Sequence, residues 1–156
     1  MLDATPHAWY STKFKLFRDG HEVGLLKPGL LTERATFAVK DVTFEFYREG
    51  WVGDFVLEFE GAALARADKP SALTRRFVLR VEDQRYVLEA ESAWRRAFRL
   101  RVEHDEEVLG RIAPKGLLTR RATIDLPEEL PLPVQAFCFW LVLVLWNRAA
   151  AAASSG

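Results

Sequence analysis

The stretch Pro131–Trp146, PLPVQAFCFWLVLVLW, decides the fold of this chain. No residue from Leu130 to Trp146 is charged, so a helix built from this stretch has no polar face to turn toward water. Such a helix belongs either in a bilayer or at the centre of a protein. The part that begins at Pro133 is shorter, at about 1.5 Å per residue, than the roughly 30 Å hydrocarbon core of a membrane. We therefore predict a buried helix over about residues 131–148.

Most of the chain before this helix alternates apolar and polar residues with a period of two, which is typical of half-buried antiparallel strands. The clearest example is the pair FVLRV and YVLEA, which flank a turn at Asp83-Gln84. Turn residues such as Asp19-Gly20 separate about eleven such segments. A barrel of eight strands is filled by side chains, whereas about eleven strands enclose a helix. The sequence thus predicts a mainly-β fold, a closed antiparallel barrel of about 11–12 short strands around the apolar helix.

An internal repeat indicates that the barrel has two similar halves. GLLKPGLLTERATF at Gly24–Phe37 recurs as GRIAPKGLLTRRATI at Gly110–Ile124, with one residue inserted before the second glycine. Within these copies, GLLTERAT and GLLTRRAT share seven of eight residues. Neither half alone can bury its apolar face, so we predict one internally duplicated barrel. We interpret GLLT as a glycine-containing turn that leads into a strand, and not as a binding site.

The composition excludes several classes of function. Lys plus Arg equals Asp plus Glu at 22 each, so no overall field draws the chain to nucleic acid. The only cysteine, Cys138, lies in the apolar helix, which favours a reducing, cytoplasmic location. The N-terminus has no basic start followed by an apolar region, so we predict no signal peptide. We expect one domain over residues 12–148, with flexible tails at residues 1–11 and 149–156.

Many short strands, charged hairpin turns, an internal duplication and a terminal apolar helix resemble the tubby C-terminal-like superfamily, which includes the LURP-one-related proteins and the phospholipid scramblases. FVLRVEDQRYVLEAES (Phe77–Ser92) and AFRLRVEHDEEVLGRI (Ala97–Ile112) carry the resemblance through their order of strand, acidic turn and strand. The resemblance spans about Lys13 to Trp146 and implies a barrel of about twelve strands around a central hydrophobic helix. It also implies either phosphoinositide binding through basic side chains, as in tubby domains, or action at membranes with a calcium-binding segment, as in scramblases.

No motif in the chain points to catalysis or to a cofactor. His7, His21 and His104 lie far apart, and neither a nucleophile motif nor a histidine–carboxylate spacing typical of metal sites is present. The acidic segment DLPEELP, residues 125–131, lacks the alternating oxygen ligands and central glycine of a calcium loop. We therefore expect no enzyme activity, no cofactor and no metal.

Three arginine doublets are the candidate binding residues. They are Arg75-Arg76, Arg95-Arg96 and Arg120-Arg121. Each lies near the end of a predicted strand, where a barrel gathers its rim residues, and guanidinium groups suit phosphate oxygens. Two doublets on one rim would form a site for the headgroup of an anionic lipid. The alternative hypothesis is that the arginines pair with Asp and Glu on a solvated surface, where each pair contributes only about 0–1 kcal/mol.

Aromatic residues outside the helix support two hypotheses. Trp9, Tyr10, Trp51 and Trp94 either lie at a membrane interface or stack on a ligand, or else they plug one end of the barrel. Trp140 and Trp146, by contrast, lie on the apolar helix and are predicted to be core residues.

The sequence favours a cytoplasmic, non-enzymatic, tubby-like barrel that binds anionic phospholipid headgroups and is peripheral to a membrane. Two alternatives remain open. One is a structural or protein-interaction module with no small-molecule ligand, whose surface charges are evenly mixed. The other is a scramblase-like protein whose apolar helix anchors it in a membrane.

Overall fold

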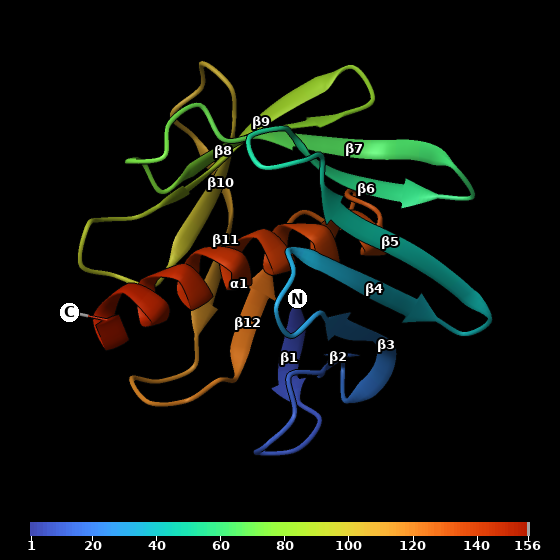
Figure 1. Cartoon of the computed structure of the whole chain (residues 1–156). Helices are drawn as coiled ribbons and strands as arrows, with labels where there is room; N and C mark the ends of the chain where they lie inside the picture. Colours follow the sequence, from blue (N-terminus) through green and yellow to red (C-terminus); the bar gives the residue numbers. More distant parts are fainter. Residues whose placement is uncertain (156) are drawn as a thin grey trace.

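The computed structural model describes residues 1–155 as twelve antiparallel strands and one helix (Figure 1). The strands pair in chain order, and β12 pairs back with β1, so the sheet closes into a barrel. The predicted closed barrel around a C-terminal helix is confirmed. The elements are β1 (Leu2–Pro6), β2 (Phe14–Arg18), β3 (His21–Pro28), β4 (Arg34–Val39), β5 (Val42–Arg48), β6 (Phe55–Phe59), β7 (Ala62–Asp68), β8 (Arg76–Val81), β9 (Gln84–Ala90), β10 (Phe98–Val102), β11 (Val108–Pro114), β12 (Ala122–Asp125) and α1 (Leu132–Ser155).

The first strand closes the barrel, and the predicted tail over residues 1–11 is therefore wrong for its first half. Leu2 pairs with Ile124 of β12, and Asp3 pairs with Phe17 of β2. Leu2 and Ala4 are completely buried. The segment LDATP has too few large apolar residues to show a strand pattern by itself. It becomes a strand because it satisfies the open edges of β2 and β12 at once.

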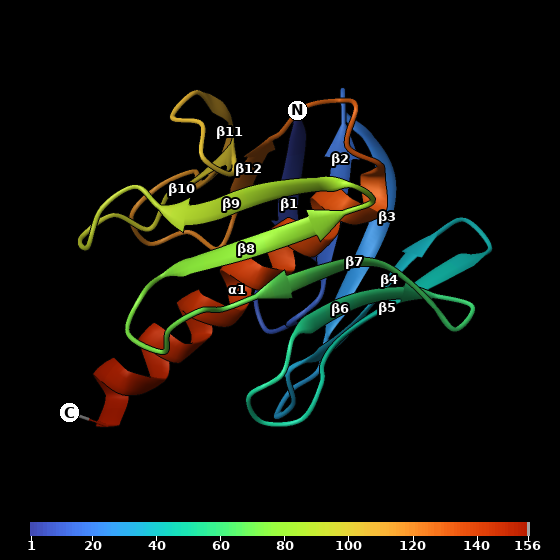
Figure 2. The same ribbon diagram turned by 90° about the horizontal axis from the view of Figure 1, so that it is seen from above.

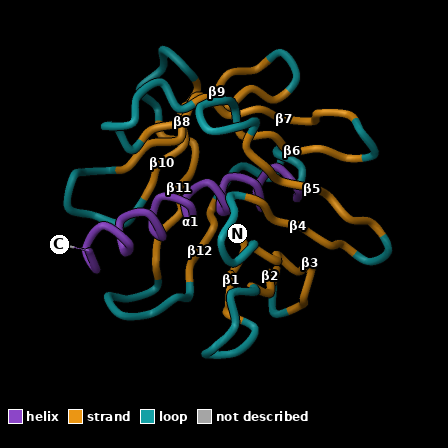
Figure 3. The backbone as a smooth tube through the Cα atoms, viewed as in Figure 1, coloured by secondary structure: helices purple, strands orange, loops and turns teal. Residues whose placement is uncertain are grey.

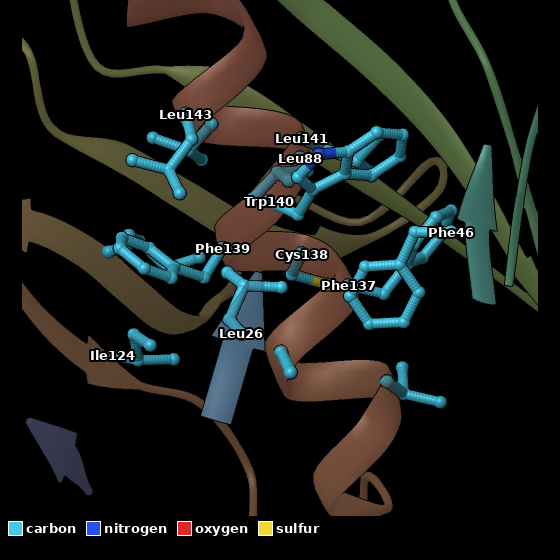
Figure 4. Close-up of a cluster of buried hydrophobic side chains, with 14 of the residues drawn as sticks. Leu26, Phe46, Leu88, Ile124, Phe137, Cys138, Phe139, Trp140, Leu141 and Leu143 are labelled. Atoms are coloured by element: carbon cyan, nitrogen blue, oxygen red, sulfur yellow. The ribbon is translucent and has the colours of Figure 1, made fainter. Parts of the chain in front are cut away.

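The helix α1 occupies the inside of the barrel (Figure 3). Every residue from Val134 to Trp146 is buried, so the helix contacts strands in all directions. Figure 4 shows Phe137, Phe139 and Trp140 leaving the helix in different directions, with Phe46 of β5 beside Phe137. The ring of Trp140 lies 5.7 Å from that of Phe46. This ring packing explains why a helix that is apolar on every side suits the centre of the barrel.

The one polar side chain in the buried part of α1 is satisfied near the helix start. Gln135 is 2% exposed, and its Nε2 donates to the carbonyl of Leu130 at 2.8 Å. The backbone N–H of Gln135 also donates to the carbonyl of Pro131 at 3.1 Å. The Gln135 side chain thus ties the incoming 126–131 segment to α1 without leaving a buried amide unpaired.

The helix continues beyond its predicted end at about residue 148. Residues 147–155 complete α1, and all of them except the half-buried Arg148 are exposed. Ala149–Ala153 is a run of the residue with the highest helix propensity, so the helix propagates from its buried part into solvent. Gly156, which belongs to the predicted tail, lies outside the described residues.

The barrel has two different ends because a meander places alternate connections on opposite sides. We call the end where α1 begins the turn end, and the end where its C-terminus emerges the loop end (Figure 2). The turn end contains the connections 19–20, 40–41, 60–61, 82–83 and 103–107, and also the 126–131 segment. The loop end contains the six loops 7–13, 29–33, 49–54, 69–75, 91–97 and 115–121.

The internal repeat appears in the backbone as two matching irregularities. Leu16 of β2 pairs with Gly24 of β3, and the register of these two strands shifts directly after Leu16. In the same way, Leu100 of β10 pairs with Gly110 of β11, and the register shifts directly after Leu100. A Cβ at Gly24 would lie 2.4 Å from the ring of Phe37, and one at Gly110 would lie 2.4 Å from the carbonyl oxygen of Asp125. Both copies therefore need glycine for close approach at a β-bulge.

Candidate functional site

All three arginine doublets lie at the loop end. Arg75 ends the 69–75 loop and Arg76 begins β8, while the other two doublets lie within the 91–97 and 115–121 loops. Contacts connect the doublets to one another. Arg75 Nη1 donates to the carbonyl of Arg95 at 3.2 Å, and Arg96 and Arg120 line one recess. Doublets separated by about 20–45 residues of sequence are thus neighbours on one rim of the barrel.

Two of these arginines hold neighbouring loops in place. Arg75 Nη1 also donates to the carbonyl of Ser92 at 3.3 Å, so this side chain fixes the 91–97 loop. Arg120 Nη1 donates to the carbonyl of Trp9 at 3.0 Å, and its Nη2 donates to the carbonyl of Ser11. Because carbonyl oxygens carry no net charge, these guanidinium groups keep their positive charge uncompensated.

Aromatic rings underlie one arginine of each doublet. The guanidinium of Arg96 lies 4.5 Å from the ring centroid of Trp146, and the Trp146 indole donates to the Arg96 carbonyl at 2.9 Å. Arg75 lies over Phe98 at 5.3 Å and Arg120 over Phe14 at 5.5 Å. These cation–π contacts orient the side chains without neutralising them.

The remaining arginine of each doublet has a different environment. Arg95 and Arg121 are exposed, and neither side chain donates a hydrogen bond within residues 1–155. Arg76 is half-buried on the outer face of β8, since the next residue, Phe77, points into the barrel. Its Nε is buried without a hydrogen-bond partner in the described structure.

No doublet arginine is within 4.0 Å of a carboxylate in the described part of the chain, whereas eight other arginines form ion pairs. On the barrel wall, for example, Arg101 Nε lies 2.9 Å from Glu89 and Arg80 Nη2 lies 2.8 Å from Asp54. The hypothesis that the doublets pair with surface carboxylates is therefore wrong. None of their charges is neutralised by a direct ion pair, although the hydrogen bond from Arg111, together with the nearby charge of Arg95, lowers the pKa of Glu91.

A recess of about 450 Å³ lies between the loops and the emerging helix. Arg96 and Arg120 contribute its basic groups, and Phe14, Leu143 and Trp146 contribute apolar surface. A second recess of about 280 Å³ flanks α1 and includes Leu31, Glu33 and Arg148. Both combine charge with apolar surface, which is the combination that an amphiphile presents.

Further basic groups lie near Arg148, which lines the second recess. Lys69 Nζ donates to the carbonyl of Ser71, and partial burial followed by the nearby charges of Arg148 and Arg48 lowers the pKa of Lys69. Glu33 offsets part of this positive charge, because its carboxylate pairs with both Arg48 and Arg148. Together, the six loops contain eight basic residues and four acidic ones.

Each of the six loops also exposes at least one large apolar side chain. We call this set the crown; its members range from 77% exposure for Tyr10 to 100% for Leu118. The crown is Trp9, Tyr10, Leu30, Leu31, Trp51, Val52, Leu73, Trp94, Leu117 and Leu118. Among residues 1–155, no large apolar residue outside these loops exceeds 60% exposure. The hypothesis that Trp9, Tyr10, Trp51 and Trp94 plug the barrel is therefore wrong.

The crown leucines were missed by sequence reasoning. Leu30, Leu31, Leu117 and Leu118 belong to the GLLT repeat, which we interpreted as a structural turn. The repeat does form loops, but its leucines point into solvent. The order of the connections could have revealed them. Every second connection of a meander lies at the same end of the barrel, and each connection at the loop end contains a Trp or a Leu.

Other sequence candidates have no site character. His7, His21 and His104 are all exposed and lie in different connections or at a strand start. Complete burial raises the pKa of the Cys138 thiol to about 12. Within the described residues, no group of three His, Cys, Asp or Glu side chains could hold a metal ion. Trp140 and Trp146 are core residues, as predicted.

One helix, α1, is long and apolar enough by length and composition to cross a membrane, and 61% of its most apolar window is buried inside the barrel. Comparisons of the chain with protein-family models, with curated proteins and with solved structures gave no match. The features of the molecule that bear on a function lie at the loop end.

Proposed function

We propose that the protein binds anionic phospholipid headgroups through its loop end, as a cytoplasmic, non-enzymatic protein that associates peripherally with a membrane. The observation that carries this proposal is that three arginine doublets meet on one rim and none of them has a carboxylate partner. Each basic side chain near an anionic membrane surface contributes about 1 kcal/mol of binding free energy. Several such side chains on one rim add up to measurable affinity.

The charge of the opposite end supports the same orientation. The turn-end connections contain eleven acidic residues and one lysine, Lys40. An anionic surface repels this end and attracts the loop end, so the barrel approaches with the doublets first. This separation of charge also argues against the alternative of an interaction module with evenly mixed surface charge.

The resemblance to the tubby C-terminal-like superfamily implies a barrel around a hydrophobic helix, and this chain has that arrangement. We infer that the chain shares the superfamily's use of basic side chains for anionic headgroups. The scramblase-like alternative, in which α1 is a membrane anchor, requires Val134–Trp146 to leave the barrel and the strands to lose their core. Burial of that stretch favours the peripheral mode.

The test is co-sedimentation with neutral and with anionic liposomes across a salt series. We expect binding to anionic liposomes only, and we expect it to weaken as salt screens the charges. The double variant Arg95→Gln/Arg121→Gln removes two exposed arginines that make no side-chain hydrogen bond. At about 1 kcal/mol for each charge, its affinity should fall about 30-fold.

The matched control is Arg18→Gln/Arg85→Gln. It removes the same charge from the last residue of β2 and from β9, where Arg85 Nε lies 2.9 Å from Glu103 near the turn end. Its affinity should stay within a factor of about two, because these positions face away from the membrane. Absence of binding to either kind of liposome would overturn the proposal and favour the protein-interaction module.

A further inference from the structure

We propose that the crown inserts into the interfacial layer of an anionic bilayer, so that the protein is held by apolar side chains as well as by charge. This inference rests on the proposed function, because it concerns the same end of the barrel. It adds a second kind of contact and names the acyl region of the lipid as the partner of the crown.

Exposed apolar surface is concentrated at one end of the barrel. Single exposed apolar residues are ordinary on a soluble protein, but ten strongly exposed ones at a single end are not. Trp51, Trp94 and Leu73 are all more than 90% exposed. Exposure of this degree means that the side chains project from the loops and do not fold back over the barrel.

The fold does not need these side chains. Both copies of the GLLT repeat place two leucines at the tip of a loop, with Leu31 99% and Leu118 100% exposed. A residue without core contacts contributes little to stability, and polar residues would connect the strands equally well. The repeated presence of leucine in solvent therefore calls for a partner outside the chain.

The crown has the shape of a ring. Its members come from six separate loops around the emerging end of α1, as the strand order around the barrel requires. Basic residues accompany them in four of these loops, for example Arg95 beside Trp94 and Arg120 near Leu118, whereas loops 29–33 and 49–54 contain none. A ring of separate apolar tips with basic residues in four of its six loops fits a flat surface whose phosphates overlie acyl chains, which is the surface of an anionic bilayer.

The chemistry of the aromatic members fits the same partner. Tryptophan and tyrosine favour the membrane–water interface, because the ring enters the apolar side while N–H or O–H remains hydrated. Trp9 and Tyr10 lie side by side in the 7–13 loop, with ring centroids 5.4 Å apart. Trp51 and Trp94 occupy two further loops, so aromatic anchors are distributed around the ring.

Negative charge does not oppose insertion. The four acidic residues of the six loops are Glu33, Glu49, Asp54 and Glu91, and each forms an ion pair with an arginine. The exposed end of α1 leaves through the same end and carries no charged side chain between Ala149 and Ser155. Its alanine-rich surface can enter the headgroup layer together with the crown.

The experiment uses tryptophan fluorescence of the full chain with phosphatidylcholine vesicles that contain phosphatidylserine. The same vesicles with brominated acyl chains serve as quenchers. We expect a blue shift on binding and quenching by the brominated chains. In the variant Trp9→Phe/Trp51→Phe/Trp94→Phe, only the core residues Trp140 and Trp146 still emit, and most of the quenching should disappear.

A second variant tests the energetic contribution of the crown. Leu31→Ser/Leu118→Ser changes the equivalent leucine in each repeat copy and should weaken co-sedimentation by about tenfold for each leucine that leaves water. The matched control Val42→Ser/Val108→Ser changes apolar residues at the starts of β5 and β11, near the turn end, which are 38% and 49% exposed. It should bind like the unchanged protein.

The outcomes separate this inference from the proposed function. Insertion would be overturned if the protein bound anionic vesicles without quenching and the leucine variant bound them with unchanged affinity. The proposal of headgroup binding would then remain intact. Absence of vesicle binding would overturn both. Self-association in sedimentation velocity that the leucine variant abolishes, without vesicle binding, would identify a second copy of the chain as the partner of the crown and overturn the bilayer.

Discussion

The two ends of the barrel connect the same strands in different ways. Four turn-end connections have only two residues, and Asp19-Gly20 and Glu60-Gly61 place both residues at positive φ, which suits tight hairpins. The loop-end connections have five to seven residues and carry the crown and the doublets. The turn end shows how little chain the fold needs for its connections. The additional length and apolar exposure of the loop end are therefore not required to connect the strands.

The largest expected effect contrasts apolar residues of the core with those of the crown. Trp140→Ala removes a ring that lies 5.8 Å from Phe55 and 5.9 Å from Phe137, and it should lower the free energy of unfolding by about 3–5 kcal/mol. Trp51→Ala should change the free energy of unfolding by no more than about 0.5 kcal/mol, because its ring is exposed. Urea unfolding measures both.

A comparable loss in the Trp51 variant would mean that the crown supports the fold, and the contrast between the two ends would lose its basis. If the Trp140→Ala variant does not fold, Trp140→Phe provides a smaller loss at the same position, measured in the same way.

The next effect contrasts the arginines of the wall with those of the doublets. Burial of Glu89 opposes its ionisation, but hydrogen bonds from Arg101 and Arg99 outweigh this effect and hold the pKa of Glu89 below its ordinary value of 4.5. A carboxyl with a lowered pKa stabilises the fold above its ordinary pKa, and that contribution is lost as pH falls through the lowered value. Glu89→Gln should therefore cost about 1–3 kcal/mol at neutral pH.

The difference in stability between Glu89→Gln and the unchanged protein should shrink as the pH falls below 4.5, and urea unfolding at several pH values measures it. Glu128→Gln is the matched control, since the Glu128 side chain is exposed at the turn end. A pH-independent difference would show that the ion pairs of the wall do not depend on the charge of Glu89.

A smaller effect sharpens the distinction between paired and unpaired charge at the loop end itself. Glu33→Gln removes the carboxylate that pairs with Arg48 and Arg148, so it should free both arginines. Affinity for anionic liposomes should rise about fivefold, which corresponds to about 1 kcal/mol. Glu103→Gln changes the net charge equally at the turn end, and an equal rise in that variant would indicate that net charge, and not position, governs binding.

The smallest effect tests whether the turn end is electrically remote from the membrane. The buried part of α1, Val134–Trp146, separates the ends by about 20 Å at the rise of an α-helix. The screening length is about 8 Å at physiological salt and about 30 Å at 0.01 M salt. Neutralising Glu82, Asp83, Glu106 and Glu107 together should leave liposome binding unchanged at physiological salt and strengthen it in dilute buffer. Equal strengthening in both buffers would contradict a membrane-facing loop end.

The fold was predictable because α1 and the strands have strong periodic signals, whereas the exceptions depend on tertiary contacts. Leu2–Pro6 is a strand because β2 and β12 both pair with it, and no local pattern contains that information. The arginine doublets were identifiable as candidates because strand ends gather at a rim. Their lack of carboxylate partners, and the exposure of Leu31 and Leu118, required the spatial arrangement, because a leucine in a sequence gives no sign of which side of a loop it occupies.

The position of α1 after all twelve strands determines when the barrel can form. During synthesis the first strand emerges long before β12, with which it must pair, and before the helix that fills the barrel. At about 5–20 residues per second, β1 waits on the order of ten seconds for that partner. The nascent strands thus remain without a core until α1 leaves the ribosome. A chain that stops before Leu132 should be recognised by chaperones and degraded, since its strands have nothing to close around.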